Sequence, residues 1–278
     1  MFQSLVYIIT SVILGQLFHI FSKIKKEFIM STYAISDLHG QYGIFEKLLD
    51  VIDFSENDFL YILGDAIDRG PDGIKILQKI KDTPNMDLLI GNHEYMMLNS
   101  IDLDGYSEDL PGDSTELWMY YNGGDETFDQ YCSLNESDRK ELVEWLLTRK
   151  LTTLIDMDVR TICLTHSYFN EECIDKEYKD CNNRVIWNIV WKTPYRYDLE
   201  IPIDHYTEKD WDFVIGHVPV QRVAGLDVKL QAFHEQNVLL IDGGCSYGPR
   251  NVLDPNEYGV ICIRLEDMSE TVVTFASL

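Results

Sequence analysis

Three short hydrophobic segments, separated by stretches with helical spacing, occupy the part of the sequence between residues 33 and 90. The segments are 33–36, 59–63 and 87–90. Between the first two, apolar residues recur at the spacing of one helix face: Phe45, Leu48, Leu49 and Ile52. Pro71 follows the second segment, where a second helix could begin. Strands that alternate with helices in this way form βαβ units, so the sequence predicts an α/β fold containing a parallel sheet with right-handed crossovers.

The middle of the chain, from residue 95 to about residue 150, is acidic and mostly helical in pattern, and we expect a helical insertion there. Ser137 is a suitable N-cap for its last helix. Hydrophobic strand segments then return at 161–165, 213–215, 238–241, 258–263 and 271–275. Because no repeat or low-complexity linker divides these parts, residues 31–278 are predicted to form one domain.

Residues 1–30 differ from the rest of the chain. Residues 1–22 contain no charged side chain, and Lys23, Lys25 and Lys26 follow directly. The segment is nearly long enough to span a membrane, and the lysines would then keep the following domain in the cytoplasm. A second interpretation is that Met30 is the true start, because a strand begins a few residues later. The sequence leaves open a membrane anchor and an upstream start artefact, and both place the catalytic domain in the cytoplasm.

The charge of the chain limits what it can bind. With 23 basic and 47 acidic residues the formal net charge is −24, which excludes a role based on broad nucleic-acid binding. Six cysteines are scattered without a Cys-x-x-Cys pair. Their distribution indicates reduced thiols, not a disulfide framework or a structural zinc site.

Polar residues cluster where the predicted strands end. They follow five of the strand segments: Asp37 and His39, then Asp65, Asp68 and Arg69, then Asn92 and His93, then His166, and finally His217. The carboxyl ends of strands in an α/β sheet line the ligand crevice, so we expect these side chains to converge there.

The residue types suit a pair of divalent ions about 3.5–4 Å apart that clamp one phosphoryl group and activate a bridging hydroxide near neutral pH. We expect Asp65 to be shared by two ligand sets: Asp37, His39 and Asp65 for one ion, and Asp65, Asn92, His166 and His217 for the other. Oxygen and imidazole ligands without thiolate favour harder ions, so Mn²⁺ is expected, with Fe, Zn or Mg as alternatives.

Three motifs together resemble those of the calcineurin-like metallophosphoesterases: Asp37-x-His39-Gly40, Gly64-Asp65-x-x-Asp68-Arg69-Gly70 and Gly91-Asn92-His93-Glu94. The resemblance implies two β-sheets packed as a sandwich and flanked by helices. Asp68-Arg69-Gly70 indicates the phosphoprotein phosphatase branch, which contains Ser/Thr protein phosphatases and symmetrical dinucleoside tetraphosphatases. Trp118 with the segment 121–124, Tyr-Asn-Gly-Gly, is similar to bacterial and phage members in particular.

The resemblance also implies roles. His93 would be the general acid for the leaving group, Asp68 would orient it, and Arg69 would bind phosphate oxygens, with Asn92 also near the substrate. Members of the family usually carry a second phosphate-binding arginine after a tryptophan, in a Trp-x-Arg context. Here Ile189 stands at that place, and Lys192 or Arg196 are the candidates to replace the arginine.

Three functions are weighed on this basis. The first is a Ser/Thr protein phosphatase that hydrolyses phosphomonoesters of phosphorylated proteins. The alternative is a dinucleoside tetraphosphate hydrolase acting on a small nucleotide, since the same site displaces oxygen from phosphorus in both reactions. The third is a non-catalytic scaffold, and the intact ligand set argues against it. The net charge of −24 slightly favours a basic phosphopeptide over a polyanionic nucleotide.

Overall fold

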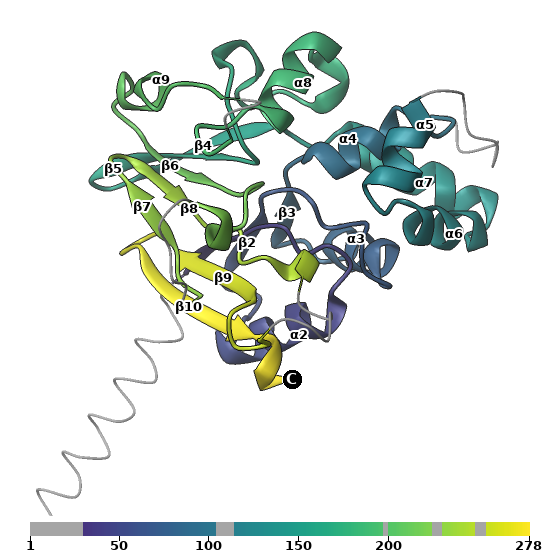
Figure 1. Ribbon diagram of the computed structural model, residues 1–278, viewed down its shortest axis with the longest axis horizontal. Helices are drawn as coiled ribbons and strands as arrows, with labels where there is room; N and C mark the ends of the chain where they lie inside the picture. Colours follow the sequence, from purple (N-terminus) through teal and green to yellow (C-terminus); the bar gives the residue numbers. More distant parts are fainter. Residues whose placement is uncertain (1–29, 104–113, 197–199, 224–229, 248–253) are drawn as a thin grey trace, which may run out of the picture.

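The computed structural model describes residues 30–103, 114–196, 200–223, 230–247 and 254–278 (Figure 1). The hydrophobic segment predicted at the amino terminus, including residues 1–22, lies outside these ranges. Within them, no helix is both long and apolar enough to cross a membrane.

The first sheet has the strand order β10-β9-β1-β2-β3. The strands are β1 (Thr32–Ile35), β2 (Phe59–Ile62), β3 (Met86–Leu88), β9 (Gly259–Arg264) and β10 (Ser269–Thr274). β1, β2 and β3 are parallel, as the βαβ pattern predicts, with Thr32 opposite Phe59 and Leu60 opposite Met86. β9 pairs antiparallel with β1 and with β10, so the sheet is mixed.

The second sheet has the order β4-β5-β6-β8-β7. Its strands are β4 (Thr152–Met157), β5 (Arg160–Thr165), β6 (Asp212–Ile215), β7 (Phe233–Glu235) and β8 (Val238–Leu240). β5, β6 and β8 are parallel, whereas β4 and β7 pair antiparallel at the two edges. The segments for β5, β6 and β8 are predicted from the sequence, and the two edge strands are not.

The two sheets pack against each other through alternate side chains of their strands. Ala34 of β1 and Ile261 of β9 belong to the same hydrophobic cluster as Phe213 of β6. The neighbouring side chain, Ile35, lies in a second cluster with Phe45 and other helix residues. This is the period-2 alternation of strands that are buried on both faces. The expectation of two sheets packed as a sandwich with flanking helices is therefore confirmed.

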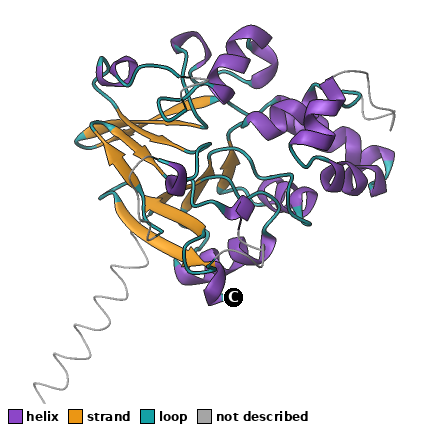
Figure 2. Ribbon diagram, in the orientation of Figure 1, coloured by secondary structure: helices purple, strands orange, loops and turns teal. Residues whose placement is uncertain are grey.

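Helices flank both sheets and extend to one side of the molecule (Figure 1). They are α2 (Tyr42–Val51), α3 (Gly73–Asp82), α4 (Asn92–Leu98), α5 (Ser114–Glu116), the π-helical turn η1 (Leu117–Tyr121), α6 (Asp125–Ser133), α7 (Glu136–Leu147), α8 (Asn183–Trp191) and α9 (Asp204–Thr207). The elements from α4 to α7 lie between β3 and β4, and they form the group of helices at the right of Figures 1 and 2.

Two helix starts differ from the sequence-based prediction. The last helix of this group is capped by Asn135, whose side chain accepts a hydrogen bond from the Asp138 N–H at 3.0 Å, so the prediction of Ser137 as N-cap is wrong. Asn135 precedes the helix and has extended backbone, as an N-cap requires, whereas Ser137 is already inside the first turn. Likewise α3 begins at Gly73 with Asp72 as N-cap, two residues after Pro71.

Candidate active site

The ends of strands from both sheets meet in one place. The loop after β1 joins the loop after β2 through hydrogen bonds from the Asp37 N–H to the Gly64 carbonyl, at 3.1 Å, and from the His39 N–H to the Asp65 carbonyl, at 2.9 Å. The second sheet joins them through the His217 N–H, which donates to Asp37 Oδ2 at 2.9 Å. The structure therefore brings together the predicted ligands, although they come from five separate segments.

Six residues of the site have left-handed backbone, with φ between 45° and 74°: Asp37, His39, Asp65, Asp68, Arg69 and His217. A non-glycine residue in this conformation costs about 1–3 kcal/mol and persists only where the surrounding structure holds it. Its repetition at successive strand ends is typical of a functional site, where side-chain direction matters more than local backbone preference.

The first ligand set surrounds His39 Nε2. His39 Nδ1 lies 3.2 Å from the Ile67 carbonyl oxygen, which can only accept, so Nδ1 carries the ring proton and Nε2 carries a lone pair. Nε2 lies 3.8 Å from Asp65 Oδ2 and 4.0 Å from Asp37 Oδ1. Asp37 Oδ1 is buried and has no hydrogen-bond partner in the described part of the chain. The Arg69 guanidinium also faces this lone pair, with Nη1 3.3 Å from His39 Nε2. Lone pairs of two carboxylates and one imidazole that converge in this way fit a cation.

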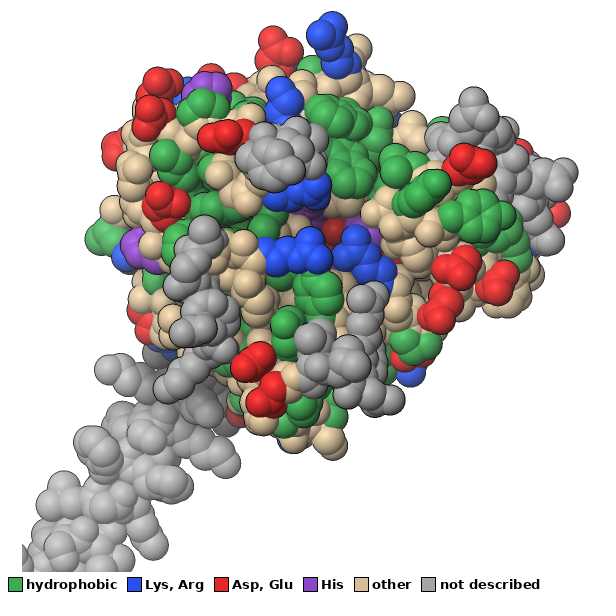
Figure 3. All heavy atoms as spheres, viewed as in Figure 1, with side chains coloured by type: hydrophobic (Ala, Val, Ile, Leu, Met, Phe, Trp, Pro, Cys, Tyr) green, Lys and Arg blue, Asp and Glu red, His purple; other side chains and the backbone are tan. Residues whose placement is uncertain are grey.

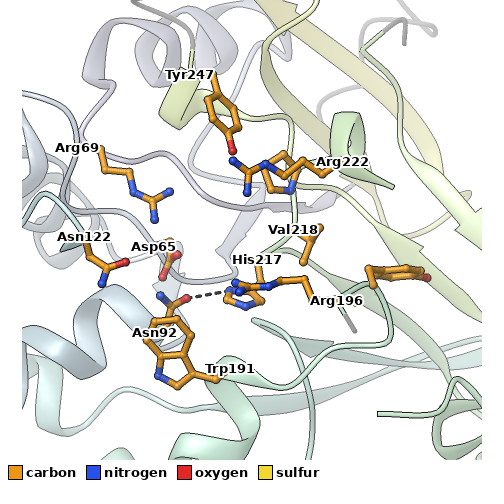
Figure 4. A pocket seen from close by; sticks show the side chains of 12 residues that line it. Asp65, Arg69, Asn92, Asn122, Trp191, Arg196, His217, Val218, Arg222 and Tyr247 are labelled. Atoms are coloured by element: carbon orange, nitrogen blue, oxygen red, sulfur yellow. Dashed lines mark hydrogen bonds between the residues drawn. The ribbon is translucent and has the colours of Figure 1, made fainter. Parts of the chain in front are cut away.

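The second ligand set has the same character. His166 Nδ1 faces the Leu63 carbonyl oxygen at 2.7 Å, which leaves the lone pair on Nε2. That Nε2 lies 2.9 Å from Asn92 Oδ1 and 3.5 Å from Asp65 Oδ1. His217 Nδ1 also lies 2.9 Å from Asn92 Oδ1, as the dashed line in Figure 4 marks. Asp65 thus offers one oxygen to each set, as expected for a carboxylate shared by two ions, and the backbone carbonyls orient the imidazoles as partners of metal ligands do.

The burial of these side chains and the repulsion between their carboxylates also favour a bound cation. Burial raises the pKa of the Asp65 carboxyl well above its ordinary value, and the neighbouring Asp37 and Glu94 carboxylates raise it further. Burial lowers the pKa of His39 and of His217 well below the ordinary value, with positive neighbours adding to the effect. Neutral imidazoles and crowded carboxylates are the donor set that divalent ions bind, so the residues present fit the metal ions that the sequence predicts.

A buried Asp–His pair lies next to the first ligand set. His93 Nδ1 and Asp68 Oδ2 are 2.6 Å apart, and both side chains are fully buried. His93 Nε2 lies 3.7 Å from Asp65 Oδ2 and has no hydrogen-bond partner in the described chain. Its position relative to His39 and Asp65 would also permit metal binding. The bond to Asp68 favours a proton-transfer role, because it fixes the ring proton on Nδ1 and holds Nε2 toward the centre.

A cavity of about 440 Å³ opens over the two ligand sets (Figure 4). Its lining includes three arginines, Arg69, Arg196 and Arg222, and three aromatic residues, Trp191, Tyr195 and Tyr247. Figure 3 shows basic side chains gathered around a hollow in which acidic and histidine side chains are visible. Of the two predicted replacements for the second arginine, Arg196 lines the cavity and Lys192 does not.

Several residues that organise the site received no role from the sequence. Glu94 accepts hydrogen bonds from the backbone N–H groups of Asp65, Ala66 and Gly91, at 2.8 to 3.0 Å, and so ties the loops after β2 and β3 together. Its place in the third motif is a signal that could have indicated this. Trp118, which donates to Asp68, belongs to a segment that the resemblance singles out without assigning it a role. Thr127, which accepts from the Asp68 N–H, and Arg222 have no comparable sequence signal.

Comparisons with known proteins find similarity to phosphoesterases. The family model for calcineurin-like phosphoesterases matches residues 30–255. The symmetrical bis(5'-nucleosyl)-tetraphosphatase of Wigglesworthia glossinidia brevipalpis is 46% identical over 71 residues, which is 25% of this chain and 26% of that protein. Serine/threonine-protein phosphatase 2 of Salmonella typhimurium is 28% identical over 173 residues, 60% of this chain and 72% of that protein.

This chain spans less than half the length of these symmetrical tetraphosphatases, from 26% for the Wigglesworthia protein to 47% for that of Haemophilus ducreyi. Among solved structures, the metallophosphoesterase of Sphaerobacter thermophilus has a TM-score of 0.51 at 18% identity and covers 88% of this chain and 87% of its own. At that identity the likeness concerns the fold alone.

Proposed function

The chain belongs to the calcineurin-like phosphoesterase family, and from this premise we propose that it cleaves a phosphoanhydride bond of a dinucleoside polyphosphate. A metal-dependent hydrolase of phosphoric esters or anhydrides is the coarse function of the family. The choice of a polyphosphate over a phosphoprotein is the proposal, and it reverses the order of preference that the sequence alone suggests.

The observation that carries the proposal is the set of three arginines around one cavity. Arg69 lies after β2, Arg196 after α8 and Arg222 in the loop after β6, yet all three line the same space (Figure 4). Although the chain has a net charge of −24, three positive side chains are concentrated at this cavity. A substrate with four phosphates needs more positive side chains for binding than a phosphomonoester with one. The local field decides binding, so the overall negative charge does not exclude an anionic substrate.

The aromatic side chains of the cavity support the same substrate class. Trp191, Tyr195 and Tyr247 lie on its wall, and the Arg222 guanidinium lies over the Tyr247 ring at 5.1 Å. Nucleobases stack on aromatic rings and on guanidinium planes. A nucleoside attached to the phosphate chain would therefore find a suitable surface beside the arginines.

The ligand sets support a proposal for which residues would hold the metal ions. Asp37, His39 and Asp65 would hold one ion, and Asp65, Asn92, His166 and His217 would hold the other. When bound, the ions supply Lewis acidity to the phosphoryl group and lower the pKa of a water molecule, and Mn²⁺ is our expectation for their identity.

The remaining steps are performed by the side chains of the chain itself. Arg69 donates to phosphate oxygens through its planar guanidinium and counters the charge that spreads over them. As the bond from phosphorus to the leaving oxygen breaks, that oxygen gains negative charge, and the proton on His93 Nε2 neutralises it. Burial and the nearby Arg69 guanidinium lower the pKa of His93 well below its ordinary value, and the Asp68 carboxylate at Nδ1 opposes this effect by favouring the cationic form before the transfer.

A Ser/Thr protein phosphatase is the second candidate. One observation favours it: the Salmonella phosphatase aligns over 60% of this chain, whereas the Wigglesworthia tetraphosphatase aligns over 25%. The substrate of such an enzyme would place its phosphate between Arg69 and the ligand sets and leave its peptide on the outer rim.

A comparison of kcat/KM for two substrates tests the proposal. The Mn²⁺-loaded protein is assayed with diadenosine tetraphosphate and with a phosphoserine peptide, and the nucleotide products are separated. We expect a higher kcat/KM for the tetraphosphate, with ADP as its product if cleavage is symmetrical. Turnover of the phosphopeptide alone would establish the second candidate instead.

A further inference from the structure

The loop that carries Asp68 and Arg69 depends on the segment from the turn η1 to the first turn of α6. Both residues have left-handed backbone, with φ of 68° and 66°, so the loop needs external support. Three hydrogen bonds provide it. Trp118 Nε1 donates to Asp68 Oδ2 at 2.8 Å, the Asp68 N–H donates to Thr127 Oγ1 at 2.9 Å, and the Arg69 N–H donates to the Gly123 carbonyl at 2.9 Å.

Trp118 is the part of this segment that reaches the chemistry. It is fully buried, although Tyr120 and Tyr121 on the same π-helical turn are 80% and 78% exposed. Its ring packs edge-on against Phe128, with the ring centres 6.2 Å apart. Gly124 leaves the room that the indole needs, because a Cβ there would lie 2.4 Å from Trp118 Nε1. The indole N–H is therefore held toward Asp68 from two sides.

The indole shares its acceptor atom with the general-acid candidate. Asp68 Oδ2 accepts from Trp118 Nε1 and from His93 Nδ1, whereas Asp68 Oδ1 is buried without a hydrogen-bond partner in the described chain. Because both donors meet on one oxygen, the indole sets the rotamer of the carboxylate. The carboxylate in turn sets the orientation of the His93 ring and the direction of Nε2.

We propose that Trp118 is a positioning residue, which acts through Asp68 to aim His93 Nε2 at the leaving oxygen. The inference rests on the proposed function for the identity of His93 as proton donor. The inference adds that the helical segment between β3 and β4 aligns the acid. The proposed metal ligands, in contrast, are held by the ends of the strands.

The decisive variants are Trp118→Phe, which removes the N–H and keeps an aromatic ring, and Gly124→Ala, which displaces the indole without removing it. Gly124 has φ −79°, so alanine fits its backbone. Phe128→Leu is the matched control, because it disturbs the packing of the indole and leaves its N–H in place. Each variant is assayed with Mn²⁺ on phenyl phosphate and on p-nitrophenyl phosphate, and its bound metal is measured.

For Trp118→Phe and Gly124→Ala we expect kcat on phenyl phosphate to fall by about 10- to 100-fold at unchanged KM and metal content. The loss should be much smaller on p-nitrophenyl phosphate, whose leaving group hardly needs a proton. Phe128→Leu should change both substrates equally. Equal losses on the two substrates in Trp118→Phe would overturn the proposal, because they would indicate a packing role.

A measurement without turnover separates this inference from the proposed function. In side-chain ¹⁵N–¹H NMR of the metal-free protein, the His93 Nδ1 proton bonded to Asp68 should be shifted strongly downfield. It should move or exchange faster in Trp118→Phe and remain in Phe128→Leu. A signal unchanged in Trp118→Phe would overturn the positioning role whatever the wild-type protein hydrolyses. Failure of the wild-type protein to cleave diadenosine tetraphosphate would overturn only the proposed function.

Discussion

The two halves of the active site are built from different parts of the molecule. The predicted metal ligands follow strands of both sheets and are held by the sandwich core, in which the clustered side chains of β1, β6 and β9 are almost fully buried. The loop with Asp68 and Arg69 is held from outside the sheets, by Trp118, Gly123 and Thr127. The groups expected to bind metal are therefore held by strand ends. The proposed general acid and the phosphate-binding Arg69 depend instead on the helical segment between β3 and β4.

This difference has a consequence for dynamics. The helical element exposes large hydrophobic side chains, including Leu117, Tyr120 and Tyr121, and so has less apolar burial per residue than the sheets. Segments with fewer buried contacts open at lower free energy. Local opening there would disable proton transfer and leave the ligand sets assembled.

The largest effect is expected for Asp65→Asn, which tests the metal-binding half of the site. Asp65→Asn removes the one carboxylate that both ligand sets share, so bound metal should fall and activity should drop to that of the protein treated with EDTA. Metal content is measured by atomic emission after gel filtration, with Asp212→Asn at the surface ion pair as control. Full metal content in Asp65→Asn would contradict the shared role.

His93→Asn should affect the other half alone. We expect kcat to fall by about 10²–10⁴-fold on phenyl phosphate, less on p-nitrophenyl phosphate, and bound metal to stay at the wild-type level. The parallel metal analysis also decides a structural alternative, since His93 Nε2 lies 3.7 Å from Asp65 Oδ2. Loss of one ion in this variant would make His93 a metal ligand.

The arginines should have intermediate effects that depend on the substrate. Arg196→Ala and Arg222→Ala should each raise KM for diadenosine tetraphosphate by about 10- to 100-fold, because one charge-assisted hydrogen bond contributes about 1.5–3 kcal/mol. KM for p-nitrophenyl phosphate should change less, since that substrate carries one phosphate. Lys192→Ala is the matched test, because Lys192 is the other predicted cation and does not line the cavity. A larger effect from Lys192→Ala than from Arg196→Ala would reverse the assignment.

The smallest effect tests the outer support of the Asp68 loop. Thr127→Val removes the acceptor of the Asp68 N–H and should lower kcat about threefold and destabilise the fold by about 1 kcal/mol, the usual value of one neutral hydrogen bond. Thr127→Ser keeps the hydroxyl and should restore kcat. Urea unfolding gives the stability, and a rescue absent from the serine variant would argue against the hydrogen bond.

Much of the fold was predictable from local pattern. The segments for β1, β2, β3, β5, β6, β8, β9 and β10 are hydrophobic runs that end in polar residues, and this pattern needs no knowledge of distant contacts. The edge strand β7 was not predicted because it has three residues and little burial. β4 carries exposed and half-buried residues in its second half, which hides its pattern.

The residues of the candidate site also fall into a group that the sequence predicts and a group that only the structure reveals. The sequence by itself determined which residues offer metal-binding chemistry, because Asp37, His39, Asp65, Asn92, His166 and His217 stand where strands end, and the ends of parallel strands share one edge. Only the tertiary structure decided which side chains surround them. Trp118 and Thr127 reach Asp68 from 50 and 59 residues away, and Arg196 and Arg222 approach the cavity from loops whose paths no local pattern specifies. Periodicity and motifs record what a residue does within its own element, whereas a contact between distant segments arises only when the packing of the whole chain brings them together.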